Sequence, residues 1–157
     1  MALAAAAVLG GCCDDDGPGK PAPAEIRAEG YDCGFTGPAT AVVWDVDPEA
    51  GTVPPAFDPV EAVWCKLEDG PLDSAGVPSV IVNEHRSVHV APLIKRFATP
   101  DTELEDGVTC DTAWSLDLIP PRVWLLDAEG RAVLGHSPWG ICAPDPAGLE
   151  QAFPDAR

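Results

Sequence analysis

The chain has 157 residues, enough for one domain, and it is strongly acidic. It carries 26 Asp and Glu against 9 Lys and Arg, which gives a formal net charge of −17 at pH 7. This charge argues against nucleic acid as a partner, because nucleic-acid binding depends on cationic side chains that neutralise phosphates. The same charge argues against electrostatic adhesion to anionic lipid and is typical of a surface that keeps a protein soluble.

The chain begins with an apolar stretch, residues 2–11, made only of Ala, Leu, Val and Gly. A transmembrane helix needs about 20 apolar residues, so this stretch is too short to cross a membrane. It fits the apolar core of a signal peptide, and we expect a signal peptide over residues 1–11. No Lys or Arg precedes the stretch, so the usual basic start is either absent or lies upstream of this sequence.

The motif Leu9-Gly10-Gly11-Cys12 resembles a bacterial lipobox, which has a branched apolar residue, two small residues and then Cys. The same frame fits Cys13 poorly, because it would place Cys12 directly before the modified residue. The resemblance implies removal of residues 1–11 and attachment of a diacylglyceryl group, with acyl chains such as palmitate, to Cys12. Each buried methylene contributes about 0.8 kcal/mol, so two or three chains would hold the protein at the membrane. An ordinary cleaved signal peptide followed by a chance Cys is the alternative.

Residues 12–30 are predicted to be the lipidated Cys and a flexible tether. The stretch DDDGPGKPAPAE contains Pro, Gly, Ala and charge with no apolar periodicity. Such a segment cannot bury enough surface to offset its loss of conformational entropy. We therefore expect a single globular domain over residues 31–157.

Four cysteines lie in this domain: Cys33, Cys65, Cys110 and Cys142. Outside the cell an even set predicts two disulfide bonds, for which three pairings are possible. Cys33–Cys65 and Cys110–Cys142 are favoured, because each closes a local loop of similar length and would contribute about 3–4 kcal/mol. A zinc site needs closely spaced pairs such as CxxC, which the domain lacks, so we expect no metal and no cofactor.

Apolar patterning predicts short elements along the domain. The clearest is a hairpin, in which two apolar runs flank Asp127-Ala128-Glu129-Gly130. Both alternate sets of its first strand are apolar, so we expect that strand to be covered on both faces. Pro92 suits the first turn of a short helix whose Leu93, Ile94 and Phe97 share one face. The predicted ranges are strands at 41–46, 60–66, 78–83, 114–118, 123–126 and 132–134, and helices at 92–98 and 144–153.

These elements predict an α+β fold, a small antiparallel sheet with one or two short helices, stapled by disulfides. The order of a strand containing Cys65, a short helix ending before Pro100, the segment PPRVWLLDAEGRAVL and Cys142-Ala-Pro before a terminal helix resembles small uncharacterised lipoproteins of high-GC Gram-positive bacteria. The resemblance covers roughly residues 57–153 together with the lipobox. It implies the lipid anchor and the disulfides, and it implies no catalytic residue.

Two groups of residues suggest metal binding only weakly. His85 and His89 would share a face on a helix, but the residues before them favour a strand, on which they would lie about 13 Å apart. We therefore expect surface histidines, and the same for His136. The run DVDPEAG from Asp45 resembles the start of a calcium loop but lacks the Gly and Glu that such a loop requires, so it is interpreted as an acidic turn.

Trp64-Cys65, followed later by a Pro, a strand, an acidic turn and another strand, resembles part of a thioredoxin-like domain. The resolving Cys of that family should stand at position 68, which is Glu68, and a loop follows where a helix should begin. A buried structural half-cystine is the expected state of Cys65. Trp64 and Trp124 are predicted core residues, whereas Trp139, in HSPWG, is the candidate for an exposed contact with a partner.

The sequence therefore predicts a lipid-anchored extracytoplasmic protein of the cell envelope, a binding or structural module rather than an enzyme. Its partners would be the membrane, through the N-terminal lipid, and a protein or small-molecule ligand. A thiol-redox protein using Cys65 and a cell-envelope hydrolase are the alternatives. No Ser/His/Asp arrangement, Gly-rich phosphate loop or catalytic carboxylate pair stands out in the sequence.

Overall fold

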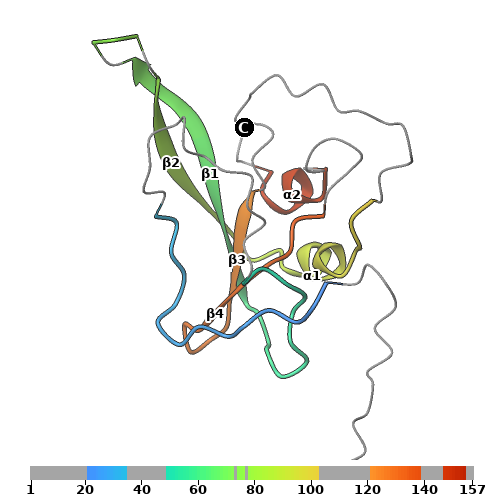
Figure 1. Ribbon diagram of the computed structural model, residues 1–157. Helices are drawn as coiled ribbons and strands as arrows, with labels where there is room; N and C mark the ends of the chain where they lie inside the picture. The colour runs from blue at the N-terminus through green and yellow to red at the C-terminus, as the bar shows by residue number, and fades with distance from the viewer. Residues whose placement is uncertain are drawn as a thin grey trace, which may run out of the picture.

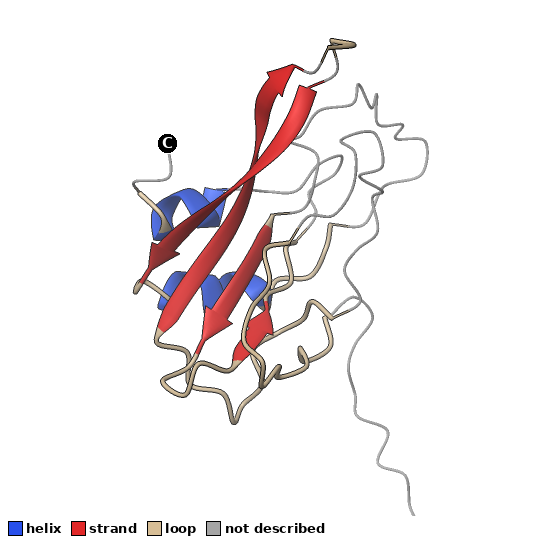
Figure 2. Cartoon of the chain, turned by 90° about the vertical axis from the view of Figure 1, so that its left-hand side faces the viewer, coloured by secondary structure: helices blue, strands red, loops and turns tan. Residues whose placement is uncertain are grey.

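The computed structural model describes residues 21–34, 49–72, 74–76, 78–102, 121–138 and 147–154. Within them, four antiparallel strands form one sheet, and two short helices lie on one face of it (Figure 1, Figure 2). The predicted α+β class with a small antiparallel sheet is confirmed in this form. The elements in chain order are β1 (Glu61–Leu72), β2 (Pro78–Ser87), α1 (Ala91–Phe97), β3 (Arg122–Leu126), β4 (Ala132–Leu134) and α2 (Ala147–Ala152).

The strands lie in the order β2-β1-β3-β4, so β1 and β3 are central. Trp64 of β1 lies opposite His85 of β2 and Val123 of β3. Val63, its neighbour, lies opposite Arg86 and Trp124. Because side chains alternate along a strand, this register divides the sheet into a face beneath the helices and a second face.

The face beneath the helices holds the larger of two apolar clusters. Leu93 and Phe97 of α1 are fully buried, as the spacing of four residues predicts for one side of a short helix. Ile94 was predicted to share this face, and that prediction is wrong, because Ile94 is 36% exposed. The inward positions expected near the C-terminus are confirmed, since α2 and the residue after it bury Leu149, Ala152 and Phe153. The cluster also includes Ala62, Val123, Leu125 and Val133 of the sheet.

Both described helices lie on the other face of the sheet, and part of the N-terminal segment packs against the second face. Arg27 pairs with Ala132 at the edge of β4 through two backbone hydrogen bonds, and Tyr31 and Cys33 pack against the buried cluster of the second face. Ala24 and Ile26 belong instead to the cluster beneath the helices. Residues 21–30, predicted to belong to the tether, therefore lie along the sheet. The physical reason is that both faces of the sheet are apolar, including the second face with Val63 and Trp124, and apolar faces must be covered. We call residues 27–34 the strap.

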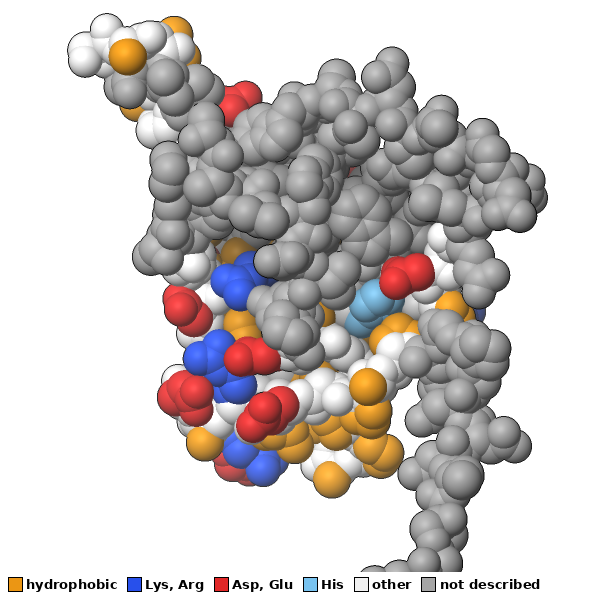
Figure 3. All heavy atoms as spheres, in the orientation of Figure 1, with side chains coloured by type: hydrophobic (Ala, Val, Ile, Leu, Met, Phe, Trp, Pro, Cys, Tyr) orange, Lys and Arg blue, Asp and Glu red, His pale blue; other side chains and the backbone are white. Residues whose placement is uncertain are grey.

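Strands β1 and β2 are longer than the predicted 60–66 and 78–83. β3 pairs only with Glu61–Cys65, so the rest of the β1–β2 hairpin projects beyond it as an arm (Figure 1). The turn-like residues Gly70 and Pro71 lie inside β1, where the register shifts between Asp69 and Leu72. A bulge of this kind accommodates such residues without ending the strand. Near the end of the arm Leu72 is 68% exposed, and Figure 3 shows apolar side chains at the tip.

The predicted β3–β4 hairpin is confirmed. The Asp127 carboxylate accepts hydrogen bonds from the backbone N–H groups of Glu129 and Arg131 and from the Arg131 side chain. Gly130 has φ +80°, which the turn requires and Gly adopts readily. Val123 and Trp124 point to opposite faces and are both almost fully buried, so β3 is covered on both faces as expected.

Several predictions fall on residues outside the described ranges. They concern the leader and Cys12, the strands at 41–46 and 114–118, the pair Cys110–Cys142, and Trp139. The beginning of the predicted helix at residues 144–146 also lies there.

Gly135 follows β4 at a point where the chain passes directly against the ring of Phe97. A Cβ atom at this position would overlap the ring, which is itself fully buried. We predict that Gly135→Ala lowers the free energy of unfolding by about 1–3 kcal/mol, because overpacking displaces a core side chain. Urea unfolding followed by tryptophan fluorescence measures this loss. In a Phe97→Leu background the same substitution should cost less, and an equal cost in both backgrounds would contradict the proposed contact.

Asp127 makes the stability of the hairpin depend on pH. Burial alone would raise the pKa of this carboxyl group, but hydrogen bonds from Arg131 and its charge outweigh burial and lower the pKa. A lowered pKa in the folded state stabilises the protein above the ordinary pKa and stops doing so as pH falls through the lowered value. Asp127→Asn should therefore be less stable than the natural protein at pH 7, with a difference that shrinks under acid conditions. Urea unfolding over a pH series tests this, and a difference independent of pH would contradict it.

Candidate functional site

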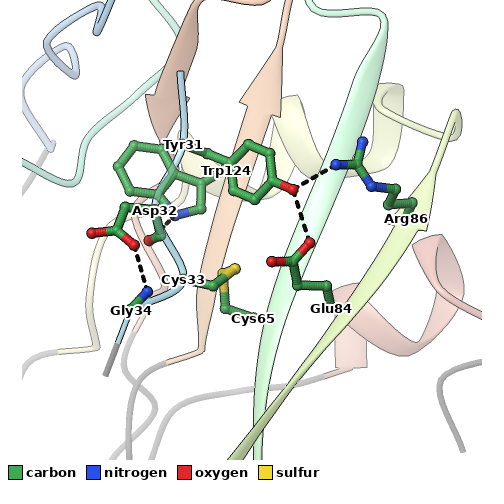
Figure 4. The surroundings of a disulfide bond; sticks show 8 residues. All are labelled: Tyr31, Asp32, Cys33, Gly34, Cys65, Glu84, Arg86 and Trp124. Carbon is green, nitrogen blue, oxygen red and sulfur yellow. Dashed lines mark hydrogen bonds between the residues drawn. A yellow bond between two sulfur atoms is a disulfide. The ribbon is translucent and has the colours of Figure 1, made fainter. Parts of the chain in front are cut away.

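The strap is joined to the centre of the sheet by a disulfide bond between Cys33 and Cys65. The two Cα atoms are 5.4 Å apart, and the bond spans 32 residues of sequence. Cys65 lies within β1 and is 4% exposed, whereas Cys33 lies on the strap and is half-buried. Figure 4 shows the bond and the side chains around it. This is one of the two pairings that the sequence favoured.

Trp124 forms the floor beneath the strap. Its indole Nε1–H donates a hydrogen bond of 3.1 Å to the backbone carbonyl of Asp32. The guanidinium of Arg27 lies over the indole ring, with Cζ 5.2 Å from the ring centroid. The predicted core position of Trp124 is thus confirmed, and the buried N–H group has the partner that a buried indole requires.

Tyr31 connects the strap to β2 through a polar cluster that we define as Tyr31, Glu61, Glu84 and Arg86. The Tyr31 hydroxyl donates a hydrogen bond of 2.8 Å to Glu84 Oε2 and accepts one from Arg86 (Figure 4). Arg86 Nη1 also donates to Glu61 Oε2 at 2.9 Å. The bond to Glu84 raises the pKa of Tyr31, and the bond to Glu61 raises that of Arg86.

The polar cluster was not predicted from the sequence. Glu84 and Arg86 are two residues apart on β2, so they share the face on which Cys65 lies. From this alternation the sequence could have predicted that Glu84 and Arg86 lie on the same face as Cys65. No pattern in the sequence predicts that Tyr31 contacts β2.

An open groove of about 340 Å³ lies beside the polar cluster. It begins at Glu61 and Arg86, and its apolar part includes Val88, which is 73% exposed. The positive charge of Arg86 is compensated by Glu61, so the groove offers hydrogen-bonding groups next to a small apolar surface. The other residues lining it are Ser87, His89 and Pro154.

The histidines lie apart from one another. His85 packs against Trp64 beneath the helices, with ring centroids 6.0 Å apart, and His89 is exposed after the end of β2. His136 was predicted at the surface, and that prediction is wrong, since it is 6% exposed. The backbone N–H of His136 donates a hydrogen bond to the Gly51 carbonyl, which joins this residue to the segment around Gly51.

His136 Nε2 lies 3.1 Å from Asp101 Oδ1, at ion-pair distance but without hydrogen-bond direction. In the described part of the chain, no three His, Cys, Asp or Glu side chains are grouped as metal ligands would be. Within the same residues no helix has the length and apolar character needed to cross a membrane.

Trp64 was predicted to be a core residue and is half-buried, with its ring 5.7 Å from that of Phe153. Cys65, the next residue, lies within a strand, whereas the thioredoxin-like arrangement considered above places its reactive Cys at the start of a helix. Searches against protein-family models, curated proteins and solved structures found no match for this chain. The interpretation of the site therefore rests on its own geometry.

The chain contains one tyrosine, so its ionisation reports directly on the polar cluster. We predict that Tyr31, followed by absorbance near 295 nm, ionises above the ordinary tyrosine pKa, because the bond to Glu84 favours the neutral phenol. The hydrogen bond of the neutral phenol stabilises the fold at pH values below the ordinary tyrosine pKa. This stabilisation is lost as pH rises through the raised pKa of Tyr31.

Glu84→Ala should move the ionisation of Tyr31 to lower pH, because it removes the hydrogen-bond acceptor. Glu150→Gln, an exposed change on α2, is the matched control and should leave the titration unchanged. An equal titration in the natural protein and in Glu84→Ala would show that the Tyr31–Glu84 contact is absent in solution.

Proposed function

We propose that this protein is a lipid-anchored module at the extracytoplasmic face of the cell membrane that binds a protein or a small molecule. The observation that carries the proposal is the Cys33–Cys65 disulfide, which is built into the packing of the sheet. Disulfides of this kind form and persist in oxidising compartments outside the cytoplasm. The compartment that the disulfide favours is also the one that the lipobox at Cys12 implies.

The anchor also limits where the domain can sit. Pro21, the first described residue, is nine residues beyond Cys12, and an extended chain spans at most about 3.3–3.6 Å per residue. Lipid on Cys12 would therefore hold the start of the domain within about 30 Å of the membrane. The described chain, blue at its start, begins far from the tip of the β1–β2 arm (Figure 1). An anchored domain would thus be able to direct the arm away from the lipid.

The polar cluster and the groove beside it supply a surface suited to binding. Tyr and Arg are enriched among residues that dominate binding energy, and here Tyr31 and Arg86 are held in place by hydrogen bonds. Val88 adds an exposed apolar contact at the same groove. We propose this groove as a contact surface, with Trp139 as a second one outside the described residues.

A thiol-redox function using Cys65 is the alternative, and the state of the thiols separates the two. A binding module needs no reactive thiol at Cys65, whereas a redox protein needs a Cys65 thiolate that reacts readily. The burial of Cys65 supports the binding module, because a thiolate is disfavoured in apolar surroundings.

The anchor is tested by extracting the full chain from membranes without reductant, alkylating it and measuring intact and peptide masses. We predict that the mature chain begins at Cys12 and carries lipid, and that Cys33 and Cys65 remain unalkylated. Cys12→Ser should abolish lipid attachment and membrane retention, and Cys13→Ser should change neither. An unlipidated N-terminus would overturn the anchor, and ready alkylation of Cys65 would favour the redox alternative.

A further inference from the structure

The two sulfur atoms of the Cys33–Cys65 disulfide differ in access. Cys65 belongs to a buried cluster with Val63, Trp124 and Leu134 on the second face of the sheet. Cys33 packs against this cluster from outside and is only half-buried. In Figure 4 Cys33 comes from the strap and Cys65 from β1, so the bond runs from the outer layer down to the sheet.

This arrangement decides which sulfur an external thiol can attack. Thiol–disulfide exchange proceeds by attack of a thiolate on one sulfur, in line with the bond that breaks. Cys65 is 4% exposed and lies within a buried cluster, so an external thiolate has little access to its sulfur. Approach to Cys33 comes from outside the strap, where the side chain is partly exposed.

The disulfide also holds the strap closed over Trp124. The other side-chain links include the hydrogen bond from Trp124 to Asp32, the contact of Arg27 with the Trp124 ring, the ion pair of Arg27 with Glu49, and the bonds of Tyr31 to Glu84 and Arg86. Tyr31 and Arg86 are partly exposed, so water competes for their bonds once the strap can move. The Cys33–Cys65 disulfide is the covalent link between the strap and the sheet, and reduction breaks it.

We propose that the strap is a latch that a dithiol releases by attack on Cys33. The first thiolate of the dithiol bonds to Cys33 Sγ, the bond between the two cysteine sulfurs breaks, and Cys65 leaves as a thiolate that takes a proton from water. The second thiolate of the dithiol then attacks the first sulfur of the dithiol, which releases Cys33 as a thiolate that is protonated in turn. Two electrons pass from the dithiol, which becomes a disulfide, to the protein, which gains two thiols. Release frees Tyr31 from β2 and uncovers Trp124. This proposal does not depend on the lipid anchor.

The site of attack is tested with a monothiol, because the mixed disulfide that it forms first can be trapped before a second monothiol resolves it. The full chain is incubated with excess glutathione, quenched with acid, treated with N-ethylmaleimide and analysed by peptide mass. The proposal expects glutathione on Cys33 and maleimide on Cys65. Glutathione on Cys65, or equally on both, would overturn the order of attack. The same chain in guanidinium is the control and should carry adducts on both residues, because the folded access difference is gone.

A native chain that forms no adduct at Cys33 or Cys65, under conditions that modify both in guanidinium, would also overturn the proposal. The disulfide would then be a permanent staple. Opening of the strap is measured separately, by reducing the chain with dithiothreitol, alkylating it and titrating Tyr31 near 295 nm. The raised ionisation of Tyr31 should be lost, and a titration unchanged by reduction would show that the strap stays closed.

Reduction of other cysteines is controlled with the double variant Cys33→Ser/Cys65→Ser. Far-UV circular dichroism first establishes that this variant is folded. Its Tyr31 should titrate as in the reduced natural chain, with no further change on addition of dithiothreitol. A further change would assign the effect to other cysteines and overturn the latch. If the double variant does not fold, the position of the glutathione adduct in the natural chain still decides the order of attack.

Discussion

The structure depends on one constraint: the central strand β3 is apolar on both faces, and both described helices lie on the same face of the sheet. The other face must be covered by something else, and Tyr31 and Cys33 of the strap pack against its buried cluster. Arg27 extends the sheet at β4 through backbone hydrogen bonds, which also protects that edge from pairing with other chains. The strap then crosses Trp124, and the Cys33–Cys65 disulfide joins it to β1.

This cover places the candidate site where it is. A disulfide between the strap and the central strand brings Tyr31 to the face that carries Glu84 and Arg86. The same arrangement buries Cys65 and leaves Cys33 on the outside, so a bond that stabilises the fold has one accessible end. The same disulfide therefore has two effects. It stabilises the fold by reducing the conformational entropy of the unfolded chain, and it determines how the strap can be released.

The parts of the fold that the sequence predicted are those set by local signals. The β3–β4 hairpin follows from a turn whose Asp127 and Gly130 carry its geometry, and α1 follows from Pro92 and the spacing of Leu93 and Phe97. Local signals of this kind do not predict contacts between segments that are distant in sequence. Residues 21–30 look like a spacer because their order comes from backbone bonds to β4 and to Thr52. The backbone of His136 likewise bonds to Gly51, a residue distant in sequence. The pairing of Cys33 with Cys65 belongs to one of the three possible sets of disulfides. The position of the strap along β1 decides among them.

The central claim is that the N-terminal segment belongs to the folded domain, with the strap over the second face and residues 24–26 packed against the cluster beneath the helices. Native-state hydrogen exchange tests this most directly, through the amide N–H of Arg27 and the indole N–H of Trp124. The account predicts that both are protected, because each donates a hydrogen bond, to Ala132 and to Asp32 respectively. Exchange of both at the rate of an unstructured peptide, while the amides of β3 remain protected, would contradict it and return the N-terminal segment to the role of a tether.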